Sequence, residues 1–204
     1  MANNVKKPLT KRAEATRAAL AMAGREVFEK VGFPAARVAD IVAAAGVSHG
    51  SFYNYWDSKE DLFLELFTEV EGELLDGIAA EGDTLEESIS RGITGFVTKY
   101  RANAAFLLAI EQVATFHPEI QERRLATRRS TVERVSAQIR IYQRKGLADP
   151  TLDATTVAKA LLSMVGHFTY MWLALGEHED FHRAVNTLTR LWVLALNPPA
   201  EAAT

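Results

Sequence analysis

Apolar residues recur along this chain at spacings of three and four, and no segment shows a convincing alternation of apolar and polar positions. This periodicity is typical of amphipathic α-helices rather than β-strands. Leu20, Val27 and Phe28 mark one face of a first helix, over about residues 10–31, and Gly32 stands at its C-terminal cap position. The pattern therefore predicts an all-α protein.

Capping residues and helix breakers divide the rest of the chain. Asp83 precedes Glu86 by three residues, an Asp variant of the capping box, and Asp153 is a candidate N-cap. The further helices are expected at about 38–45, 48–55, from the turn at 57–60 onward, 83–101, 103–116, 118–145, 153–176 and 179–196. About nine helices are thus expected, with a domain boundary between residues 60 and 61.

Residues 36–62 form the most informative segment. Val38, Ile41 and Val42 give a short helix an apolar inner face, and Gly46 permits the positive φ that a sharp turn needs. A second short helix, rich in small and polar residues, follows the turn. This arrangement predicts a helix-turn-helix, which lays its second helix in the major groove of DNA.

The side chains of this second helix divide into two groups. Phe52 and Trp56 point to the core on helical spacing, and Ser48 is placed to cap the helix. The residues expected on the outer face or within reach of DNA are His49, Gly50, Ser51, Tyr53, Asn54 and Tyr55. The alternative is that Tyr53, Tyr55 and Trp56 only anchor a small domain.

Charge is distributed unevenly along the chain. The net charge is −3, but residues 1–60 carry nine lysines and arginines against six acidic residues, which gives +3. Residues 61–204 carry fourteen against twenty, which gives −6. The basic end contains the helix-turn-helix, so a polyanion is attracted to that end of the chain.

Residues 10–63 closely resemble the DNA-binding domain of the TetR family of transcriptional regulators. The matching motifs are Gly32-Phe33, Val38-Ala-Asp40-Ile41, Ala45-Gly46-Val47-Ser48, Gly50 to Trp56 and Ser58 to Leu62. The resemblance implies a domain 1–60 that binds double-stranded operator DNA and a domain 61–204 that binds ligand and dimerises. It also implies that Ser48 faces DNA together with the outer-face residues, and that Lys59 meets a phosphate at the start of the fourth helix.

The chain departs from the family pattern at two places. Ala36-Arg37 replaces the Thr or Ser that often caps the second helix, so Arg37 is expected to contact phosphate by charge. His49 stands where a lysine or arginine is common, and could meet a base or a phosphate. The N-terminal arm, with Lys6, Lys7, Lys11 and Arg12, is either a solvated tail or a further phosphate contact.

The longer helices after residue 65 are rich in aromatic residues, which core packing would also explain. The resemblance implies a ligand pocket among them, and the candidates to line it are Phe96, Tyr100, Phe106, Gln112, Phe116, Tyr142, Met164, His167, Phe168, Met171 and Trp172. Gly92 and Gly95 serve either a close helix approach or ligand space. The last two helices are apolar on more than one side, which predicts a homodimer contact through Val157, Leu161, Val165, Val185, Leu188 and Trp192.

Other classes of site find little support. The chain has no cysteine for a disulfide or thiolate metal site, no signal-peptide core, and no apolar stretch that reads as a membrane span. His178 and His182 could bind a metal, but read better as an exposed helix start. We therefore expect no metal, no cofactor and no enzymatic activity. We expect a cytoplasmic location.

The sequence thus predicts a ligand-responsive, dimeric DNA-binding regulator, a repressor that a small apolar effector releases from a palindromic operator. The rival interpretation is a helical enzyme, or a carrier of lipids or other small molecules, with a vestigial helix-turn-helix. A third alternative is an activator, or a regulator without a ligand, which the sequence does not separate from a repressor.

Overall fold

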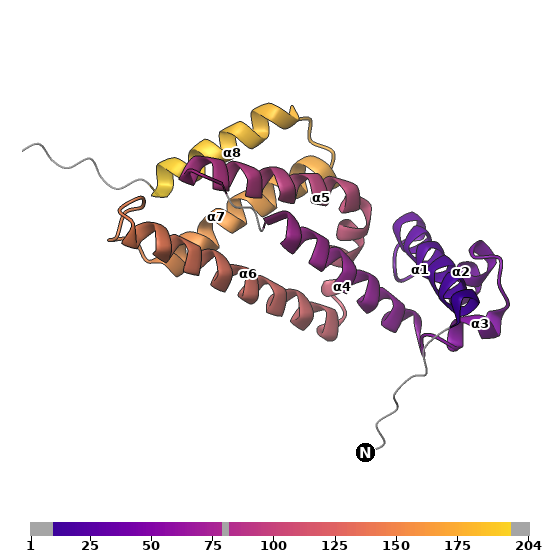
Figure 1. Ribbon diagram of the computed structural model, residues 1–204. Coiled ribbons are helices and arrows are strands. Elements are labelled where there is room, and N and C mark those ends of the chain that lie inside the picture. Colours follow the sequence, from indigo (N-terminus) through magenta and orange to yellow (C-terminus); the bar gives the residue numbers. More distant parts are fainter. Residues whose placement is uncertain (1–9, 79–81, 197–204) are drawn as a thin grey trace, which may run out of the picture. The chain divides into compact units, whose positions relative to one another are not determined.

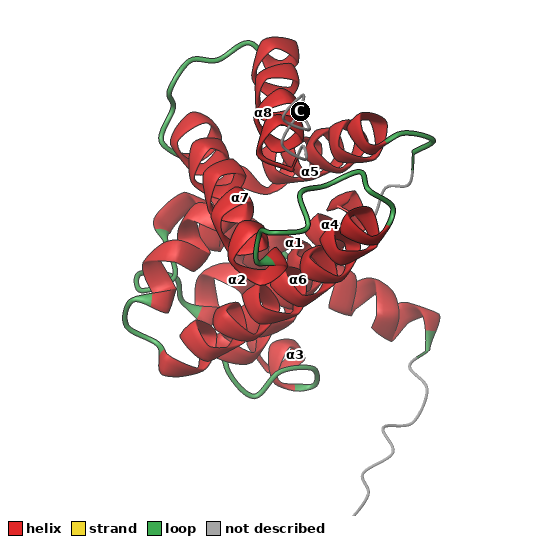
Figure 2. Ribbon diagram, turned by 90° about the vertical axis from the view of Figure 1, so that its left-hand side faces the viewer, coloured by secondary structure: helices red, strands yellow, loops and turns green. Residues whose placement is uncertain are grey.

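The computed structural model describes residues 10–78 and 82–196, and every regular element within them is helical (Figures 1 and 2). The elements are α1 (Lys11–Val31), α2 (Val38–Ala44), α3 (His49–Tyr53), α4 (Lys59–Ile78), α5 (Leu85–Ala114), α6 (Pro118–Arg144), α7 (Ala154–Thr169), the π-helical turn η1 (Tyr170–Ala174) and α8 (Phe181–Leu196). The all-α prediction is confirmed, with eight α-helices in the described part of the chain.

The chain divides into two compact units, unit 1 (Met1–Glu69) and unit 2 (Val70–Thr204), and their boundary lies inside α4. The domain boundary expected after residue 60 is a division by function and stays a prediction. Each unit has a core of its own, described separately below.

The core of unit 1 is built on three phenylalanines. The rings of Phe28, Phe33 and Phe63 contact one another at centroid distances of 4.9 to 5.7 Å, and all three are buried. Gly24 on α1 faces Leu62 so closely that a Cβ at position 24 would overlap the leucine side chain. Glycine therefore lets α1 pack directly against the first half of α4.

In unit 2, α5 packs against α8 and α6, and α6 packs against α7. In Figure 1, α8 lies next to the first half of α5. A Cβ on Gly77 of α4 would stand 2.8 Å from the carbonyl group of Gly95 on α5. The two backbones are in contact there, so Gly95 serves close helix approach rather than ligand space. Gly92 is less crowded, with the carbonyl oxygen of Ile78 3.3 Å from its added Cβ.

A buried carboxylate fixes the second half of α4 within unit 2. Glu71 is 5 % exposed, and it accepts from Nε of Arg123 at 2.9 Å and from the hydroxyl of Thr127. Arg124 and Arg129 form ion pairs with Glu111 and Glu122. The arginine cluster of α6 is therefore largely engaged with acidic partners.

Three local predictions need correction. The two helices expected over 83–101 and 103–116 are one helix, because Asn103 does not break it: its amide donates to the carbonyl of Lys99 and to Glu73. The cap of α5 is Thr84 rather than Asp83, and its hydroxyl accepts from the N–H of Glu87. The segment expected to continue as one helix from Asp153 to Gly176 changes to η1 at Tyr170.

Other caps are as expected. Asp153 accepts from the N–H of Thr156 at 2.8 Å and so caps α7. Gly32, Gly46 and Gly176 all have positive φ, as their turns require.

Candidate nucleic-acid interface

The helix-turn-helix folds as its apolar pattern predicts. Ile41 and Val42 are buried beneath α2, Gly46 turns the chain at φ 67°, and α3 begins at His49. Phe52 is fully buried and anchors α3 from below. The side of α3 that faces solvent carries His49, Gly50, Tyr53 and Asn54, which we call the open face of α3.

The open face combines stacking, hydrogen bonding and free space. The rings of His49 and Tyr53 are in edge contact at 5.6 Å, and Tyr53 is 51 % exposed. A Cβ added at Gly50 would meet nothing within 4 Å, so a phosphate or base edge could approach the backbone there. Asn54 follows α3 as its C-cap and is exposed.

Trp56 fixes the chain just beyond α3. Its indole N–H donates to Oε2 of Glu65 at 3.0 Å, and the guanidinium of Arg17 lies 5.1 Å from its ring. Arg17 also forms an ion pair with Glu65 at 2.5 Å. Trp56 is 4 % exposed, so it is a structural residue that ties the end of the motif to α1 and α4.

Tyr55 is not free to meet DNA through its hydroxyl. That hydroxyl donates to the backbone carbonyl of Ala13 on α1 at 2.9 Å. The prediction of a DNA contact for Tyr55 is corrected on this ground, since such a contact would have to break a bond inside unit 1. The anchoring alternative describes Tyr55 as well as Trp56, whereas Tyr53 remains open.

Lys59 is also engaged within the protein. Its ammonium donates to the carbonyls of Phe33 and Ala36 at 2.8 and 2.9 Å, with that of Pro34 at 3.4 Å. It also lies 4.6 Å from the centroid of the Phe33 ring. An ammonium has three protons, and these carbonyls use them. Lys59 therefore braces the loop between α1 and α2, and the phosphate contact expected for it stays a prediction.

Neither short helix has the side-chain cap that a helix start usually carries. Ser48 bonds the hydroxyl of Ser51 at 2.8 Å instead of a backbone N–H, which corrects its expected capping role. Arg37, the N-cap residue of α2, makes no capping bond and is exposed. Its guanidinium therefore remains a candidate for a phosphate contact.

Lys11 and Arg12 lie in the first turn of α1 and are exposed. Thr10 caps this helix by accepting from the N–H of Ala13. Both basic residues are thus held on a helix rather than on a free arm. Lys6 and Lys7 lie outside the described residues.

The candidate effector residues of unit 2 separate by burial. Trp172 is buried and its ring contacts Phe168 at 6.2 Å, while Tyr100 is buried and contacts Phe96 at 5.7 Å. Phe106 is fully buried. The half-buried candidates are Phe96, Tyr142, Met164, Phe168 and Met171. The structure thus brings most of the candidates together around α5, α7 and η1.

Three candidates do not belong to this interior. Phe116 is 78 % exposed, and Gln112 and His167 are also exposed. Gln112 is on α5, which continues without a break through residue 114. Its side chain is on the solvent side of that helix, whereas the neighbouring Val113 is buried. His167 lies two residues after the buried Val165, about 200° around α7. Their assignment as pocket residues is corrected.

Tyr100 has the most perturbed acid–base chemistry in the described structure. Burial raises the pKa of its phenol far above the ordinary value of 10.0, and the nearby Glu111 carboxylate raises it further. The phenol is therefore neutral at any physiological pH. It can donate a hydrogen bond inside an otherwise apolar environment.

The predicted dimer residues lie inside the protomer. Leu161, Val165, Val185, Leu188 and Trp192 are 3 to 9 % exposed and belong to the core of unit 2, and Val157 packs against that core. Their periodicity records burial within one chain. The large apolar side chains that α8 exposes are Leu191, at 44 %, and Leu194, at 60 %.

Other sites are tested only within the described residues. There, no group of three or more His, Asp or Glu side chains is arranged to hold a metal ion, and His178 and His182 gain no third ligand. Each helix in the same range is too short or too polar to span a bilayer.

Sequence reasoning missed two features. One is the contact set of Arg17, Trp56 and Glu65, of which only the tryptophan stands out in the sequence. The other is a polar groove between α5 and α8, lined in part by Glu86 and Arg190. The polar stripe of α8 was its only sequence signal, and such a stripe is equally typical of a solvated face.

Comparison with known proteins agrees with this architecture. Residues 20–66 match the family described as bacterial regulatory proteins, tetR family, and residues 89–197 match the C-terminal domain of the transcriptional regulator EthR. The chain is 30 % identical over 173 residues to the HTH-type transcriptional repressor BepR of Brucella suis, covering 78 % of this chain and 80 % of that protein. It is 29 % identical over 193 residues to the uncharacterized HTH-type transcriptional regulator YdgC of Bacillus subtilis, covering 86 % and 90 %.

Solved structures show the same fold. The fatty acid degradation regulator FadR from Bacillus halodurans superposes with a TM-score of 0.75 at 20 % identity, covering 92 % of this chain and 97 % of that one. These comparisons do not favour the enzyme or carrier interpretation. The chain belongs to the TetR family and is a DNA-binding transcriptional regulator, not an enzyme.

Proposed function

We propose that the protein is a homodimeric repressor that places the α3 helices of two subunits in successive major grooves of a palindromic operator. The carrying observation is the open face of α3, which is exposed while Phe52 and Trp56 are buried beneath it. A twofold dimer presents such helices about 34 Å apart, one turn of B-DNA. Repression in the cytoplasm and release by a small apolar effector complete the proposal.

The open face supplies suitable chemistry for a base edge. The Asn54 amide can pair with adenine, and His49 and Tyr53 offer one ring nitrogen and one hydroxyl for bases or phosphates. Arg37, Lys11 and Arg12 are exposed cations on the same unit and are assigned to phosphates. Tyr55, Lys59 and Ser48 act indirectly, by fixing the elements that carry these groups.

The aromatic interior of unit 2 supports an apolar effector. Side chains such as Phe96, Phe168 and Met171 are half-buried, so a ligand could displace them without exposing the core. Tyr100 supplies a neutral donor to orient that ligand. A hundredfold loss of operator affinity requires about 2.7 kcal/mol of coupling between the two sites.

The proposed dimer contact lies on the exposed face of α8. Leu191 and Leu194 are one turn apart on the helix and together form an apolar stripe on its surface. A second copy of the same stripe across a twofold axis would cover both. Sedimentation of Leu194→Glu should then show dissociation that Leu152→Glu, at another exposed leucine, does not.

DNA binding is tested by fluorescence anisotropy at about 0.15 M salt with a duplex selected from a random library by the protein itself. His49→Ala and Tyr53→Ala should each weaken binding about tenfold or more without lowering the midpoint of thermal unfolding. Met22→Ala, at an exposed position on α1, is the control. If both α3 variants bind as tightly as the wild type, the open face is not the DNA-reading surface.

Phosphate contacts have a separate signature. Arg37→Ala should reduce the slope of log affinity against log salt by about one, and by the same amount on every duplex. A change that depends on the duplex sequence would contradict the phosphate assignment.

A further inference from the structure

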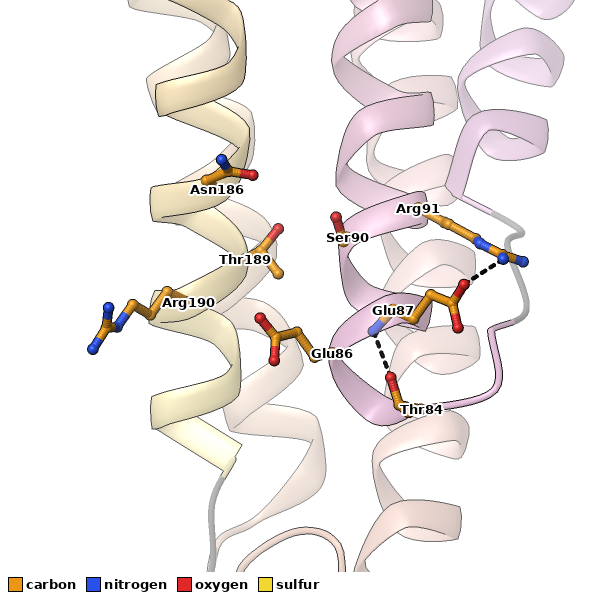
Figure 3. Close-up of a pocket in the computed structure, with 8 residues that line it drawn as sticks. All are labelled: Thr84, Glu86, Glu87, Ser90, Arg91, Asn186, Thr189 and Arg190. Atoms are coloured by element: carbon orange, nitrogen blue, oxygen red, sulfur yellow. Dashed lines mark hydrogen bonds and ion pairs between the residues drawn. The ribbon is translucent and has the colours of Figure 1, made fainter.

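A groove of about 670 Å³ lies between the start of α5 and the middle of α8 (Figure 3). The eight residues that line it all carry a polar or charged group on their side chains: Thr84, Glu86, Glu87, Ser90, Arg91, Asn186, Thr189 and Arg190. The volume is within the range of small-molecule sites, about 300 to 1,000 Å³, and the lining offers more charged and hydroxyl groups than an apolar pocket does.

Thr189 points to a ligand in this groove. The residue is 4 % exposed, and its hydroxyl has no hydrogen-bond partner among the described residues. Other helical hydroxyls bond the carbonyl four residues earlier: Thr187 bonds Arg183 at 2.7 Å and Ser163 bonds Lys159 at 2.7 Å. Buried hydroxyls are nearly always paired, so the one at position 189 is a place where an incoming polar group gains a bond.

Two of the four charged side chains in the groove form an ion pair with each other, and the other two are unpaired in the described part of the chain. Glu87 forms an ion pair with Arg91, and its N–H donates to Thr84 (Figure 3). Glu86 and Arg190 have no hydrogen bond or ion pair with any described residue. They belong to opposite walls, since Glu86 is on α5 and Arg190 is on α8.

This arrangement favours a ligand with both signs of charge. Figure 3 shows Glu86 extending from α5 toward α8, while the guanidinium of Arg190 is turned outward and must rotate to reach a ligand. A ligand with one charge can pair with either Glu86 or Arg190 but meets like charge in the other, whereas a zwitterion can pair with both. Two glutamates and two arginines make the lining neutral overall, as a zwitterion requires.

We propose that this groove binds a free α-amino acid. Glu86 holds the ammonium group, and Arg190 holds the carboxylate through its two parallel N–H donors. The hydroxyl of Thr189 donates to the carboxylate, and Ser90 and Asn186 contact the remaining polar atoms. This site is separate from the effector region and depends neither on DNA binding nor on the apolar effector.

The test uses the full chain and the proteinogenic L-amino acids, each at about 10 mM, a concentration that reveals even weak binding by mass action. At least one should raise the midpoint of thermal unfolding, and calorimetry should then give its affinity. The matching probes without one charge, such as propionate and ethylamine for alanine, should leave the midpoint unchanged.

Substitutions locate the binding. Thr189→Val, Glu86→Gln and Arg190→Gln should each weaken the amino acid found about tenfold or more. The controls Glu133→Gln and Arg134→Gln change exposed charges of α6 and should bind like the wild type. Thr189→Val keeps the branched shape and removes an unpaired hydroxyl, so the unliganded variant should be at least as stable as the wild type and its weaker binding is not misfolding.

Three outcomes overturn the proposal. The first is that no amino acid binds, and the second is that the groove variants bind as tightly as the wild type. The third is that Arg190→Gln reduces self-association in sedimentation, because a second copy of the chain would then fill the groove. None of these outcomes bears on operator binding, which anisotropy measures separately.

Discussion

The two units use polar side chains differently. In unit 1, the hydroxyl of Tyr55, the ammonium of Lys59 and the indole N–H of Trp56 each meet an acceptor within 3.0 Å. In unit 2, the hydroxyls of Thr169 and Thr189 and the indole N–H of Trp192 are buried without a partner in the part of the chain that the structure describes. Unit 1 has one such atom in its described residues, Oε1 of Glu65, and the other oxygen of that carboxylate binds two donors.

The difference corresponds to the tasks of the two units. A satisfied hydrogen-bond network holds its members in one geometry, which suits a helix that must fit a DNA groove. Unpaired polar atoms are costly without a partner, so they stabilise any state in which a ligand supplies one. The contrast fits the proposed function. The hydrogen bonds of unit 1 hold the DNA-binding helix in one geometry, and the unpaired polar atoms of unit 2 could gain hydrogen bonds from a ligand.

Lys59→Met gives the largest expected effect on the network of unit 1. The substitution removes the donor that three loop carbonyls share while keeping much of the apolar stem. Unfolding in urea should show a loss of about 2 to 3 kcal/mol, the range for hydrogen bonds to a charged group. Operator affinity should fall as well, because the loop between α1 and α2 loses its brace.

Lys145→Met, at an exposed position after α6, is the control for charge alone. If Lys59→Met were as stable as the wild type but bound DNA with a smaller salt slope, then Lys59 would be a phosphate contact. The distinction between a bracing and a reading group would be wrong at this residue.

Thr169→Val tests unit 2 and should act in the opposite direction. The Thr169 hydroxyl is fully buried and unpaired, and valine has nearly the same shape without the polar atom. The free energy of unfolding should rise by about 1 to 2 kcal/mol. Thr187→Val removes a hydroxyl that is exposed and paired and should change stability little. A destabilised Thr169→Val would mean that this hydroxyl already has a partner in solution.

Part of this contrast could be predicted from the sequence and part could not. The apolar faces, the turn at Gly46 and the caps of several helices follow from spacing and local chemistry, because each involves residues within a few positions of one another. The acceptor of Tyr55 is 42 positions away and that of Lys59 is 26, so no local pattern reports them. Both were predicted as DNA contacts because their residue types fit phosphates equally well.

Unit 2 shows a second limit. The apolar stripes of α7 and α8 correctly predict burial, but a stripe does not say whether the covering surface belongs to the same chain. Leu161 and Val185 are covered by the protomer itself, whereas Leu191 and Leu194 of α8 stay exposed. Similarly, a helix boundary was predicted next to Asn103. The Asn103 amide is bonded inside α5 by the carboxylate of Glu73, which is on α4, and local sequence does not reveal that bond.

Tyr55→Phe and Tyr53→Phe form a matched pair within unit 1. Tyr55→Phe removes one neutral hydrogen bond, to Ala13, and should lower the free energy of unfolding by about 1 kcal/mol. Tyr53→Phe should leave stability unchanged, since its hydroxyl is exposed, and should weaken operator binding. Equal behaviour of the two variants in both measurements would remove the distinction between a bracing and a reading tyrosine.

The smallest expected effect concerns Asp153, an exposed residue of unit 2. Its carboxylate is hydrogen-bonded, as are the Tyr55, Trp56 and Lys59 side chains of unit 1. Its hydrogen bonds to Thr156 lower the carboxyl pKa below the ordinary 3.8. A pKa that is lower in the folded state stabilises the fold at pH above 3.8, and this contribution disappears as the pH falls through the folded value.

Asp153→Asn keeps an N-cap oxygen but cannot titrate. The wild type should therefore be the more stable of the two at neutral pH, and urea unfolding should show that difference shrinking below about pH 4. If the difference is the same at every pH, the Asp153 carboxylate contributes nothing that an uncharged cap does not. Unit 2 would then hold α7 by cap geometry alone.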